Sequence, residues 1–314
     1  MSSNLSFIIN KSELGAGTRG ASLGPEAIQV VARQKKSKLF STHPTKVLPH
    51  LNDLLDGPTD HVYAKYIEGM QKVYDTVAEN VKKSFEQSQF PFLLSGDHCS
   101  AGGTIKGIKE AFPTASLGVI WIDAHADLHT PLTSPSGNLH GMPLATALGV
   151  ENEEMKKNKV PENTIQLWNS LKTNFVSPEC LIFIGVRDTE PEEDFLISKL
   201  GIKNYSVNEL TQRGIQETLI EIHDRLKKCD LIYVSFDVDS MDPDETSYGT
   251  GTPVENGLTV SQAESLLQGL MDSPKTAIME FVEVNPCLDE KVNKMAEVAF
   301  SLVQKLSLSK RFAQ

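Results

Sequence analysis

Short segments that are apolar throughout alternate with longer amphipathic segments, and this alternation constrains the fold of the chain more than any other feature. We predict strands over residues 6–10, 90–94, 116–122, 180–186, 231–236 and 276–284. We predict helices over residues 25–33, 61–87, 211–228, 261–271 and 292–306, and a further helix that begins at 191–194. Apolar strands that alternate with helices are typical of a parallel sheet covered on both faces. The predicted fold class is therefore α/β, a three-layer αβα sandwich with a mostly parallel central sheet, in one domain over residues 1–314.

Composition and charge exclude several classes of protein. The 314 residues are 39% hydrophobic and carry 41 acidic against 30 basic side chains, a net charge of −11. These values exclude disordered and collagen-like chains, and the acidic balance argues against nucleic-acid and anionic-membrane partners. No apolar stretch approaches the roughly 18 residues of a membrane helix, and the first residues lack the pattern of a secretory signal. The four cysteines are isolated in the sequence, so we expect reduced thiols and a cytoplasmic enzyme.

The segments between the predicted elements are of two kinds. Residues 15–24 are rich in glycine and are predicted to form a loop. Residues 45–60 and 151–164 are less periodic than the rest, and we predict that they are excursions on the surface.

Histidines and aspartates gather where three of the predicted strands end. They are His98 after the strand 90–94, Asp123, His125 and Asp127 after the strand 116–122, and Asp237 and Asp239 after the strand 231–236. Residues two apart in an extended chain point to the same side. Because open α/β sheets place their sites at the carboxyl ends of the strands, we expect these six side chains to converge.

Four converging carboxylates repel one another strongly unless cations lie between them. Two divalent ions would balance the charge, and two metals about 3.5–4 Å apart are a standard hydrolytic device. Mostly oxygen ligands with two imidazoles favour Mn²⁺ over Zn²⁺. Since an isolated DxD motif is as typical of a turn as of a metal site, the prediction depends on the three motifs together. We expect Asp97 to orient His98 and Asp242 to cap a turn.

These motifs resemble those of the ureohydrolase family, the Mn²⁺-dependent enzymes that include arginase and agmatinase. The motifs are SGDHCS at 95–100, DAHAD at 123–127, SGNLHG at 136–141, SFDVDSMDP at 235–243 and EVNP at 283–286. The stretch 117–145 is similar to the arginase version rather than the agmatinase one, and the loop GAGTRGASLGP at 15–25 is similar to the arginase N-terminal loop. The resemblance spans about residues 6–306 and implies an arginase-like fold.

The resemblance also implies two Mn²⁺ ions per chain and a bridging hydroxide as the nucleophile. It assigns His98, Asp123, Asp127 and Asp237 to the first ion, and Asp123, His125, Asp237 and Asp239 to the second. Asp127 would also carry a proton to the leaving amine, and His140 would shuttle protons, for which imidazole is suited. Glu283 would hold the planar guanidinium group of the substrate, with Thr252 beside it.

The remaining contacts implied by the resemblance lie at the amino-acid end of the substrate. Ser134, Ser136 and Asn138 match positions that hold an α-carboxylate, and Glu190 and Glu193 match positions that meet an α-ammonium group. The sequence departs from the family at His129, where arginases usually carry asparagine, and at Glu190, where aspartate is common. His129 could donate a hydrogen bond to the carboxylate of the substrate, or it could indicate that the substrate has a different head group. It could also be a surface histidine whose hydrogen bonds are made within the protein.

The leading prediction is hydrolysis of L-arginine to L-ornithine and urea. The alternatives within the family are agmatine, guanidinobutyrate, guanidinopropionate and formimidoylglutamate, the last of which would need a basic residue for its extra carboxylate. Arg187 is the only basic residue in these loops, and we expect it to brace its loop through acidic neighbours. An inactive metal-binding protein and a one-zinc deacetylase are the alternatives from other classes. The resemblance implies a homo-oligomer, either a trimer or a hexamer.

Overall fold

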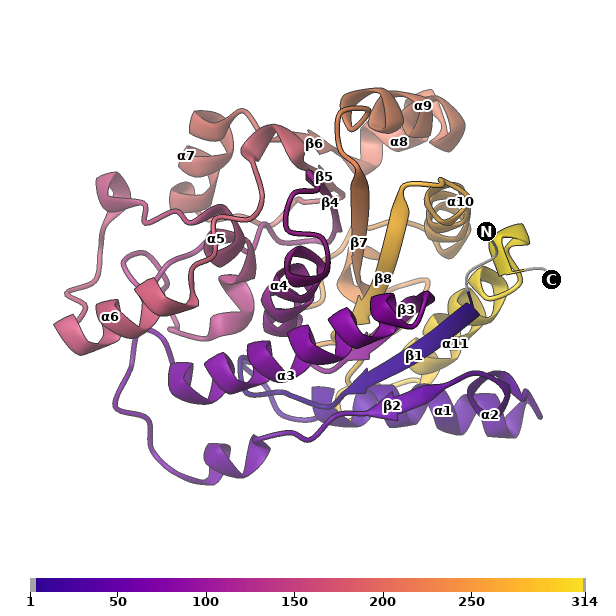
Figure 1. Ribbon diagram of the computed structural model, residues 1–314, viewed down its shortest axis with the longest axis horizontal. Helices are drawn as coiled ribbons and strands as arrows, with labels where there is room; N and C mark the ends of the chain where they lie inside the picture. The colour runs from indigo at the N-terminus through magenta and orange to yellow at the C-terminus, as the bar shows by residue number, and fades with distance from the viewer. Residues whose placement is uncertain (1–3, 313–314) are drawn as a thin grey trace.

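A computed structural model describes residues 4–312 and shows one sheet of eight parallel strands in the order β2-β1-β3-β8-β7-β4-β5-β6 (Figure 1). The strands are β1 (Asn4–Asn10), β2 (Thr45–Val47), β3 (Gln89–Ser95), β4 (Leu117–Ile122), β5 (Leu181–Ile184), β6 (Lys203–Tyr205), β7 (Leu231–Asp237) and β8 (Thr276–Val282). Every strand pairing is parallel. The predicted α/β class is confirmed.

Helices cover both faces of the sheet, and each layer has its own apolar core. One layer comprises α1 (Gly24–Gln34), α8 (Val207–Arg213), α9 (Ile215–Arg225), α10 (Val260–Met271) and α11 (Lys294–Leu306), with the short α2 (Leu39–Thr42) beside α1. The other comprises α3 (Ile67–Glu86), α4 (Ala101–Ala111), α5 (Pro143–Leu148), α6 (Glu162–Leu171) and α7 (Pro191–Leu200). Side chains alternate along each strand, so Ile120 and Ile122 enter the first core while Trp121 enters the second.

The structure differs from the predicted elements where a local conformation overrides the periodicity. The predicted helix 211–228 is interrupted at Gly214, whose φ of 87° only glycine adopts without strain. The predicted helix 61–87 begins only at Ile67, because Tyr66 before it has a φ of 58°. The strands β2 and β6 were not predicted, since each has three residues and too few apolar positions to show a period. Helices α4, α5 and α6 were also missed.

Four neighbouring strands of the sheet, in the order β3-β8-β7-β4, carry the predicted motifs at their carboxyl ends. His98 opens a 3-10 turn three residues beyond β3, and the DAHAD motif follows β4 directly. Asp237 is the last residue of β7, and Glu283 follows β8 directly. Because these strands are parallel, all four segments lie at the same edge of the sheet.

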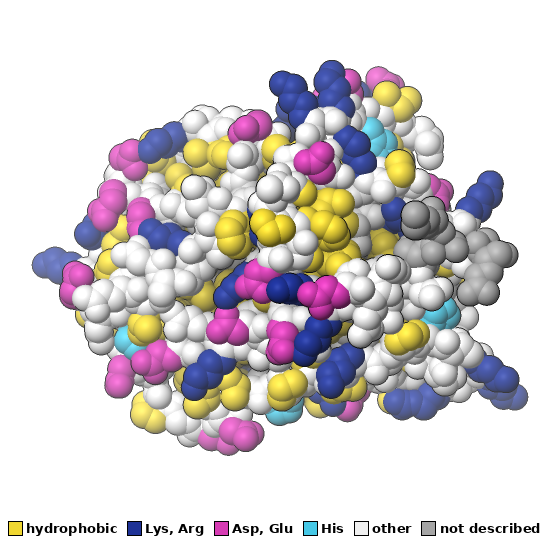
Figure 2. Space-filling view, in the orientation of Figure 1, with side chains coloured by type: hydrophobic (Ala, Val, Ile, Leu, Met, Phe, Trp, Pro, Cys, Tyr) yellow, Lys and Arg dark blue, Asp and Glu magenta, His cyan; other side chains and the backbone are white. Residues whose placement is uncertain are grey.

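The molecular surface carries charged side chains of both signs (Figure 2). On the face drawn in Figure 2, acidic and basic side chains lie interspersed. The ion pairs of the structure include Lys106–Asp75 and Lys83–Glu79. Within residues 4–312, no helix combines the length and the apolar character needed to cross a bilayer. All four cysteines are free thiols in the structure.

Candidate functional site

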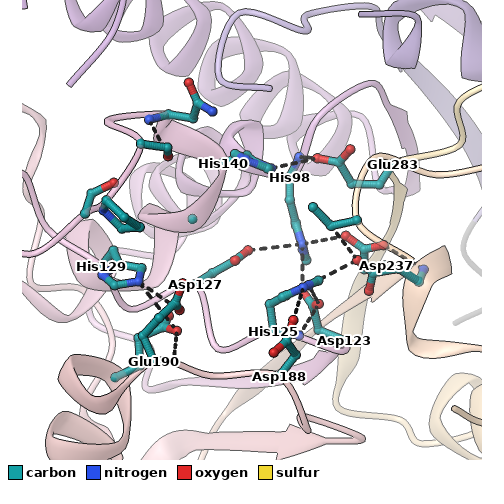
Figure 3. A pocket seen from close by; sticks show the side chains of 18 residues that line it. His98, Asp123, His125, Asp127, His129, His140, Asp188, Glu190, Asp237 and Glu283 are labelled. Atoms are coloured by element: carbon teal, nitrogen blue, oxygen red, sulfur yellow. Dashed lines mark hydrogen bonds and ion pairs between the residues drawn. The ribbon is translucent and has the colours of Figure 1, made fainter. Parts of the chain in front are cut away.

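The predicted site residues line one cavity at the carboxyl edge of the sheet (Figure 3). Its volume of about 220 Å³ is below the roughly 300–1,000 Å³ of pockets for drug-sized ligands, so it suits a small molecule. The lining contains every residue predicted to bind metal, to act in catalysis or to bind substrate: His98, Asp123, His125, Asp127, His129, Ser134, Ser136, Asn138, His140, Glu190, Glu193, Asp237, Asp239, Thr252 and Glu283. Their individual roles remain predictions.

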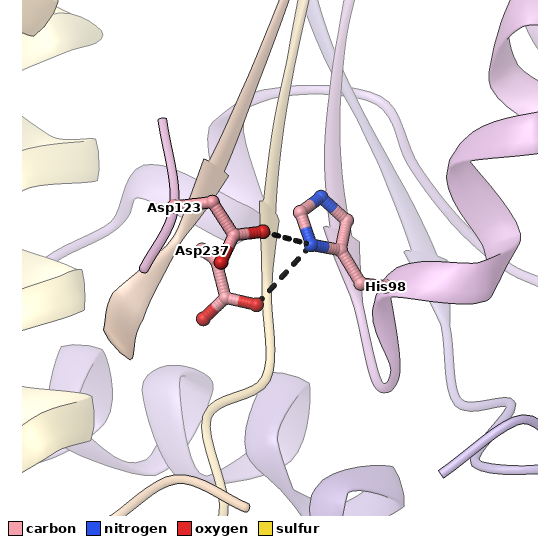
Figure 4. Close-up of side chains that lie close together, drawn as sticks. All are labelled: His98, Asp123 and Asp237. Carbon is pink, nitrogen blue, oxygen red and sulfur yellow. Dashed lines mark ion pairs between the residues drawn. The ribbon is translucent and has the colours of Figure 1, made fainter. Parts of the chain in front are cut away.

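His98, Asp123 and Asp237 meet at the base of the cavity (Figure 4). Nδ1 of His98 lies 2.9 Å from Oδ2 of Asp123, 3.2 Å from Oδ2 of Asp237 and 3.3 Å from Oδ2 of Asp127. Nδ1 of His98 and Oδ2 of Asp123 are buried and make no hydrogen bond, although buried polar atoms nearly always have a partner. An imidazole nitrogen and carboxylate oxygens that face one another in this way fit a bound cation.

His125, Asp123 and Asp239 form a second group, which shares Asp123 with the first. Nδ1 of His125 lies 3.4 Å from Oδ1 of Asp123 and 3.1 Å from Oδ2 of Asp239. The hydroxyl group of Thr252 donates a hydrogen bond to Oδ2 of Asp239 over 3.2 Å. Because Asp123 turns one oxygen toward each group, the donor set fits two cations with a shared carboxylate.

The pKa values in these two groups show how much the cluster favours positive charge. Burial raises the pKa of Asp127 well above its ordinary value, and the charge of Asp123 raises it further. Burial and the charges of Asp239 and Asp123 raise the pKa of Asp237 in the same way. Burial alone would lower the pKa of His98, but the facing carboxylates outweigh burial and the pKa lies well above its ordinary value. The raised pKa values mean that these side chains keep their protons, and the protons supply the positive charge that bound cations could supply instead.

Asp127 and Glu283 both have a left-handed backbone, with φ values of 51° and 65°. Residues with a Cβ atom rarely adopt this conformation, and such strain is concentrated at functional sites. Two contacts hold Glu283 in place: its N–H donates to the carbonyl oxygen of Gly96 over 2.8 Å, and its Oε1 accepts the backbone N–H of His98 over 2.9 Å. The strained conformation therefore directs the Glu283 carboxylate into the cavity.

His140 faces Glu283 and is positioned by the glycine-rich loop. Nδ1 of His140 lies 3.6 Å from Oε1 of Glu283, and the backbone N–H of His140 donates to the carbonyl oxygen of Gly15 over 3.0 Å. A Cβ atom on Gly15 would lie 2.7 Å from Cβ of Cys99, so the loop can approach this closely only with glycine there. Burial lowers the pKa of His140, but Glu283 and Asp97 together raise it more, and the pKa lies above its ordinary value.

One part of the outer wall is formed by His129, Glu190 and Glu193. Nε2 of His129 lies 3.0 Å from Oε2 of Glu190 and 3.7 Å from Oε2 of Glu193. The two glutamates form a capping box at the start of α7. The hydrogen bond from His129 lowers the pKa of Glu190 to about 2, whereas burial raises the pKa of Glu193 to about 7. Their ligand atoms lie within 4.8 Å of one another, so this group too could hold a cation.

Another part of the wall carries Ser134, Ser136 and Asn138. The Ser134 and Ser136 hydroxyl oxygens accept the backbone N–H groups of Gly137 and Asn138 over 2.9 and 3.1 Å. Oδ1 of Asn138 accepts a hydrogen bond from Nζ of Lys65 over 3.1 Å. Within residues 4–312 these three side chains donate no hydrogen bond. Their O–H and N–H groups are therefore free to donate to an anionic group of a ligand.

The structure contradicts the expectation that Asp97 orients the His98 ring. Its carboxylate instead accepts the backbone N–H groups of Gly15 over 2.9 Å and Cys99 over 2.8 Å. Burial raises the pKa of Asp97 to about 7. Asp97 therefore shapes the backbone turn around His98 and joins it to the glycine-rich loop.

Arg187 braces its loop, but not through acidic side chains as we expected. The guanidinium group donates to backbone carbonyl oxygens, which belong to Gly185, Asp239, Ser240, Val254 and Glu255. Asp242 caps a turn as predicted, since it accepts the N–H groups of Asp244 over 2.9 Å and Gly257 over 3.1 Å.

The comparison with known proteins identifies the family. The model of a family described as the arginase family matches residues 8–308. The chain belongs to the arginase family. Arginase from Bacillus subtilis (strain 168) is 34% identical over 315 residues, which cover 98% of this chain and 98% of the relative.

Solved structures of arginases share this fold over nearly the whole chain. The 1.7 Å crystal structure of the Bacillus subtilis enzyme is 32% identical, covers 99% of both chains and has a TM-score of 0.82. The arginase of Entamoeba histolytica, solved in complex with L-ornithine, is 25% identical, covers 96% of this chain and 99% of its own, and also has a TM-score of 0.82.

Within this arginase-family pocket, the lining residues Pro135, Gly141 and Asp188 had been given no predicted role. Oδ2 of Asp188 lies 3.6 Å from Nε2 of His125, on the side away from Asp123. A signal for Asp188 was present, because it follows a predicted strand and therefore lies at the carboxyl edge of the sheet.

Proposed function

We propose that this member of the arginase family hydrolyses L-arginine to L-ornithine and urea. One observation carries the proposal: two His/Asp groups that share Asp123 lie at the base of the same cavity that Glu283 enters. The alignment with proteins named arginase over nearly the full length supports it.

The metal centre that we propose contains two Mn²⁺ ions per chain. His98, Asp123, Asp127 and Asp237 would hold one ion, and Asp123, His125, Asp237 and Asp239 would hold the other. The buried and unpartnered atoms of His98 and Asp123 support this assignment. When bound, such ions lower the pKa of a water molecule and thereby supply a strong nucleophile near neutral pH.

The chain itself binds and orients the substrate and moves protons. Glu283 can hold the planar guanidinium cation, for which a carboxylate is the complementary partner. Asp127, already at the His98 group, can accept a proton and pass it to the leaving amine, and His140 can exchange protons between the cavity and solvent. Thr252, which donates to Asp239, holds that carboxylate in its orientation.

The polar walls of the cavity favour a substrate that is an amino acid. Ser134, Ser136 and Asn138 can donate to an α-carboxylate, and Glu190 and Glu193 can attract an α-ammonium group. Agmatine lacks the carboxylate and remains the alternative that His129 keeps open. Among the described residues that line the cavity there is no lysine or arginine, which disfavours the additional carboxylate of formimidoylglutamate.

Urea release is the direct test of this proposal. The Mn²⁺-loaded protein is assayed with L-arginine and with agmatine at matched concentrations, beside protein treated with a chelator and protein reloaded with Mn²⁺. We expect kcat/KM to be higher for L-arginine and urea release to follow the metal. Preference for agmatine would overturn the roles of Ser134, Ser136, Asn138 and Glu190, and urea from neither substrate would overturn the proposed function.

The family resemblance supports two further proposals, that the chain forms a homo-oligomer, either a trimer or a hexamer, and that it acts in the cytoplasm. Sedimentation equilibrium with and without Mn²⁺ tests the first of these. A monomer under both conditions would contradict it.

A further inference from the structure

A chain of buried hydroxyl groups joins His98 to a carboxylate that the proposed reaction does not use. Nε2 of His98 lies 2.7 Å from Oγ of Ser235. The hydroxyl oxygens of Ser235 and Tyr233 are 3.1 Å apart, and the Tyr233 hydroxyl donates to Oε2 of Glu280 over 2.7 Å. The chain begins on the side of the ring directed away from Asp123 and Asp237, as Figure 4 shows.

Glu280 is an unusual acceptor, because it is fully buried in the core of the sheet. The hydroxyl groups of Ser95 and Thr104 also donate to it, over 2.5 and 2.7 Å. Within residues 4–312 it forms no ion pair with lysine, arginine or histidine. Buried charges are normally paired with another charge or with a metal. The hydroxyl chain connects Glu280 to the ring that faces the proposed metal position.

With Glu280 accepting from its hydroxyl neighbours, the chain has one consistent direction of donation. A carboxylate accepts hydrogen bonds, and Tyr233 has a single hydrogen, which it donates to Glu280. The Tyr233 oxygen can then accept from Ser235, whose own oxygen can accept only from an N–H group at Nε2 of His98. When the His98 ring carries a single proton, as a ring that binds a metal ion does, that proton is therefore on Nε2 and Nδ1 presents its lone pair to the carboxylate group.

We propose that Glu280 is a positioning residue that fixes the tautomer of His98, through Tyr233 and Ser235, in the form that binds a metal ion. This inference depends on the proposed metal centre and deepens it. A partner on the outer nitrogen of a ligating histidine commonly sets its tautomer and increases its basicity. Here the partner is a serine that a buried carboxylate polarises through one further hydroxyl group, that of Tyr233.

The orientation of the His98 ring has a separate cause. The ring stacks on the indole of Trp121, with centroids 3.8 Å apart and planes 2° from parallel. Stacking of this kind fixes the plane of the ring but is the same for either tautomer. The hydroxyl chain therefore sets the tautomer and not the ring plane. Variants that interrupt the chain should change metal binding without displacing the ring.

The variants Tyr233→Phe and Glu280→Gln test the proposal in two ways. Tyr233→Phe removes one hydroxyl and breaks the chain with almost no change in shape. Glu280→Gln places an N–H donor at the end of the chain, which can reverse the donation and put the proton of His98 on Nδ1. Tyr205→Phe is the matched control, because it removes the hydroxyl of another fully buried tyrosine, on β6, outside this chain.

The primary measurement is Mn²⁺ binding without substrate, followed by electron paramagnetic resonance of the free ion. We expect the parent and Tyr205→Phe proteins to bind two ions each, and the affinities of the control variant to equal those of the parent. In Tyr233→Phe one of the two sites should weaken by about 10- to 100-fold, the loss typical of an altered partner to a metal ligand. In Glu280→Gln the same site should weaken at least as much.

Nitrogen NMR of ¹⁵N-histidine-labelled metal-free protein gives the second readout. At a pH high enough to leave a single proton on the ring, the parent should show the His98 proton on Nε2, and Glu280→Gln should move it to Nδ1. Parent-like affinity for both ions in Tyr233→Phe, with His98 still protonated on Nε2, would overturn the inference even if Glu280→Gln does not fold. A parent protein that binds no Mn²⁺ would overturn the proposed metal centre instead, so the two failures are distinguishable.

Discussion

Nε2 of His129 lies 3.0 Å from Oε2 of Glu190, so this histidine, at a position where the sequence resemblance implies an asparagine, closes part of the cavity wall. Nδ1 of the same ring lies 3.1 Å from the hydroxyl of Thr133, which fixes the ring from its other side. Half of the Glu190 side chain is exposed, yet its carboxylate is held in place over the cavity. His129 is therefore a part of the pocket wall that holds an acidic group in position.

Replacement of His129 by asparagine should change selectivity more than turnover. The shorter amide cannot span the distance to Glu190, so the half-exposed acidic group loses its hydrogen bond to the imidazole, a contact of about 0–1 kcal/mol after solvent screening. We expect KM for L-arginine to change by up to about 5-fold, KM for agmatine to change less, and kcat to stay within about 3-fold. Steady-state kinetics with both substrates measures this.

His61→Asn is the matched control for that experiment. His61 is also buried and contacts the Thr164 hydroxyl over 2.8 Å, but it does not line the cavity. It should leave both KM values unchanged. Equal changes in KM for both substrates in His129→Asn would place His129 away from the amino-acid end.

The same ion pair should make stability depend on pH in a defined window. The hydrogen bond from His129 depresses the folded-state pKa of Glu190 from 4.5 to about 2, so its contribution is complete above pH 4.5 and is lost as the pH falls toward 2. The pKa of His129 is raised above 6.5, with Glu190 as the main cause that opposes burial, so its contribution is complete below pH 6.5 and is lost as the pH rises.

We therefore expect the difference in the free energy of unfolding between the metal-free parent and His129→Asn to be largest from pH 4.5 to 6.5. Urea unfolding of both proteins at a series of pH values measures this difference. Since Glu190 is half exposed, solvent screening should keep the effect small. A difference that is constant from pH 3 to 9 would show that the ion pair has no role in it.

Asp123 should matter more for metal content than Asp239. Its two oxygens face His98 and His125 separately, so Asp123→Asn should weaken both sites and reduce urea release to background. Asp239→Asn should weaken one site only, because Asp239 belongs to one group. Plasma mass spectrometry of proteins equilibrated with Mn²⁺ gives the metal count.

Asp188→Asn serves as the control for Asp123→Asn. Asp188 is near His125, but its side chain is 65% exposed. The Asp188→Asn variant should therefore keep both ions. If Asp123→Asn kept two ions with parent affinity, the shared-carboxylate assignment would be wrong.

The sequence predicted those parts of the molecule that have a short-range signal. The DAHAD motif and Asp237 follow long apolar strands, and the parallel sheet brings all such strand ends to one edge. This is why the base of the cavity could be predicted before the structure was known. The three-residue edge strands had no such signal, since their periodicity is too short to detect.

Other features depend on contacts between residues far apart in the chain. Ser235 and Glu280 are register partners in β7 and β8, yet nothing local in the sequence connects them to His98. Asp97 adjoins His98, which suggested a direct contact, but the turn directs its carboxylate to backbone N–H groups instead. Neighbours in sequence were a poor guide here because side-chain direction depends on the tertiary path of the loops.

The left-handed backbone at Glu283 also has no local signal, and it leads to a prediction about stability. With a φ of 65°, the residue carries a strain of about 1–2 kcal/mol that comes from its Cβ atom and that glycine does not have. Glu283→Ala and Glu283→Gly both remove the carboxylate and its bond to the His98 backbone, so both should lose urea release. The two variants differ in that the alanine variant keeps the backbone strain caused by a Cβ atom, whereas the glycine variant relieves it.

We therefore expect metal-free Glu283→Gly to be more stable than metal-free Glu283→Ala by about 1 kcal/mol in urea unfolding. At Glu79, within the regular helix α3, the same comparison should have the opposite sign, because glycine destabilises a helix by about 1 kcal/mol relative to alanine. The opposite signs would separate backbone strain from any general effect of glycine. If alanine were the more stable replacement at both positions, Glu283 would not be strained, and its direction into the cavity would need only the contacts to Gly96 and His98.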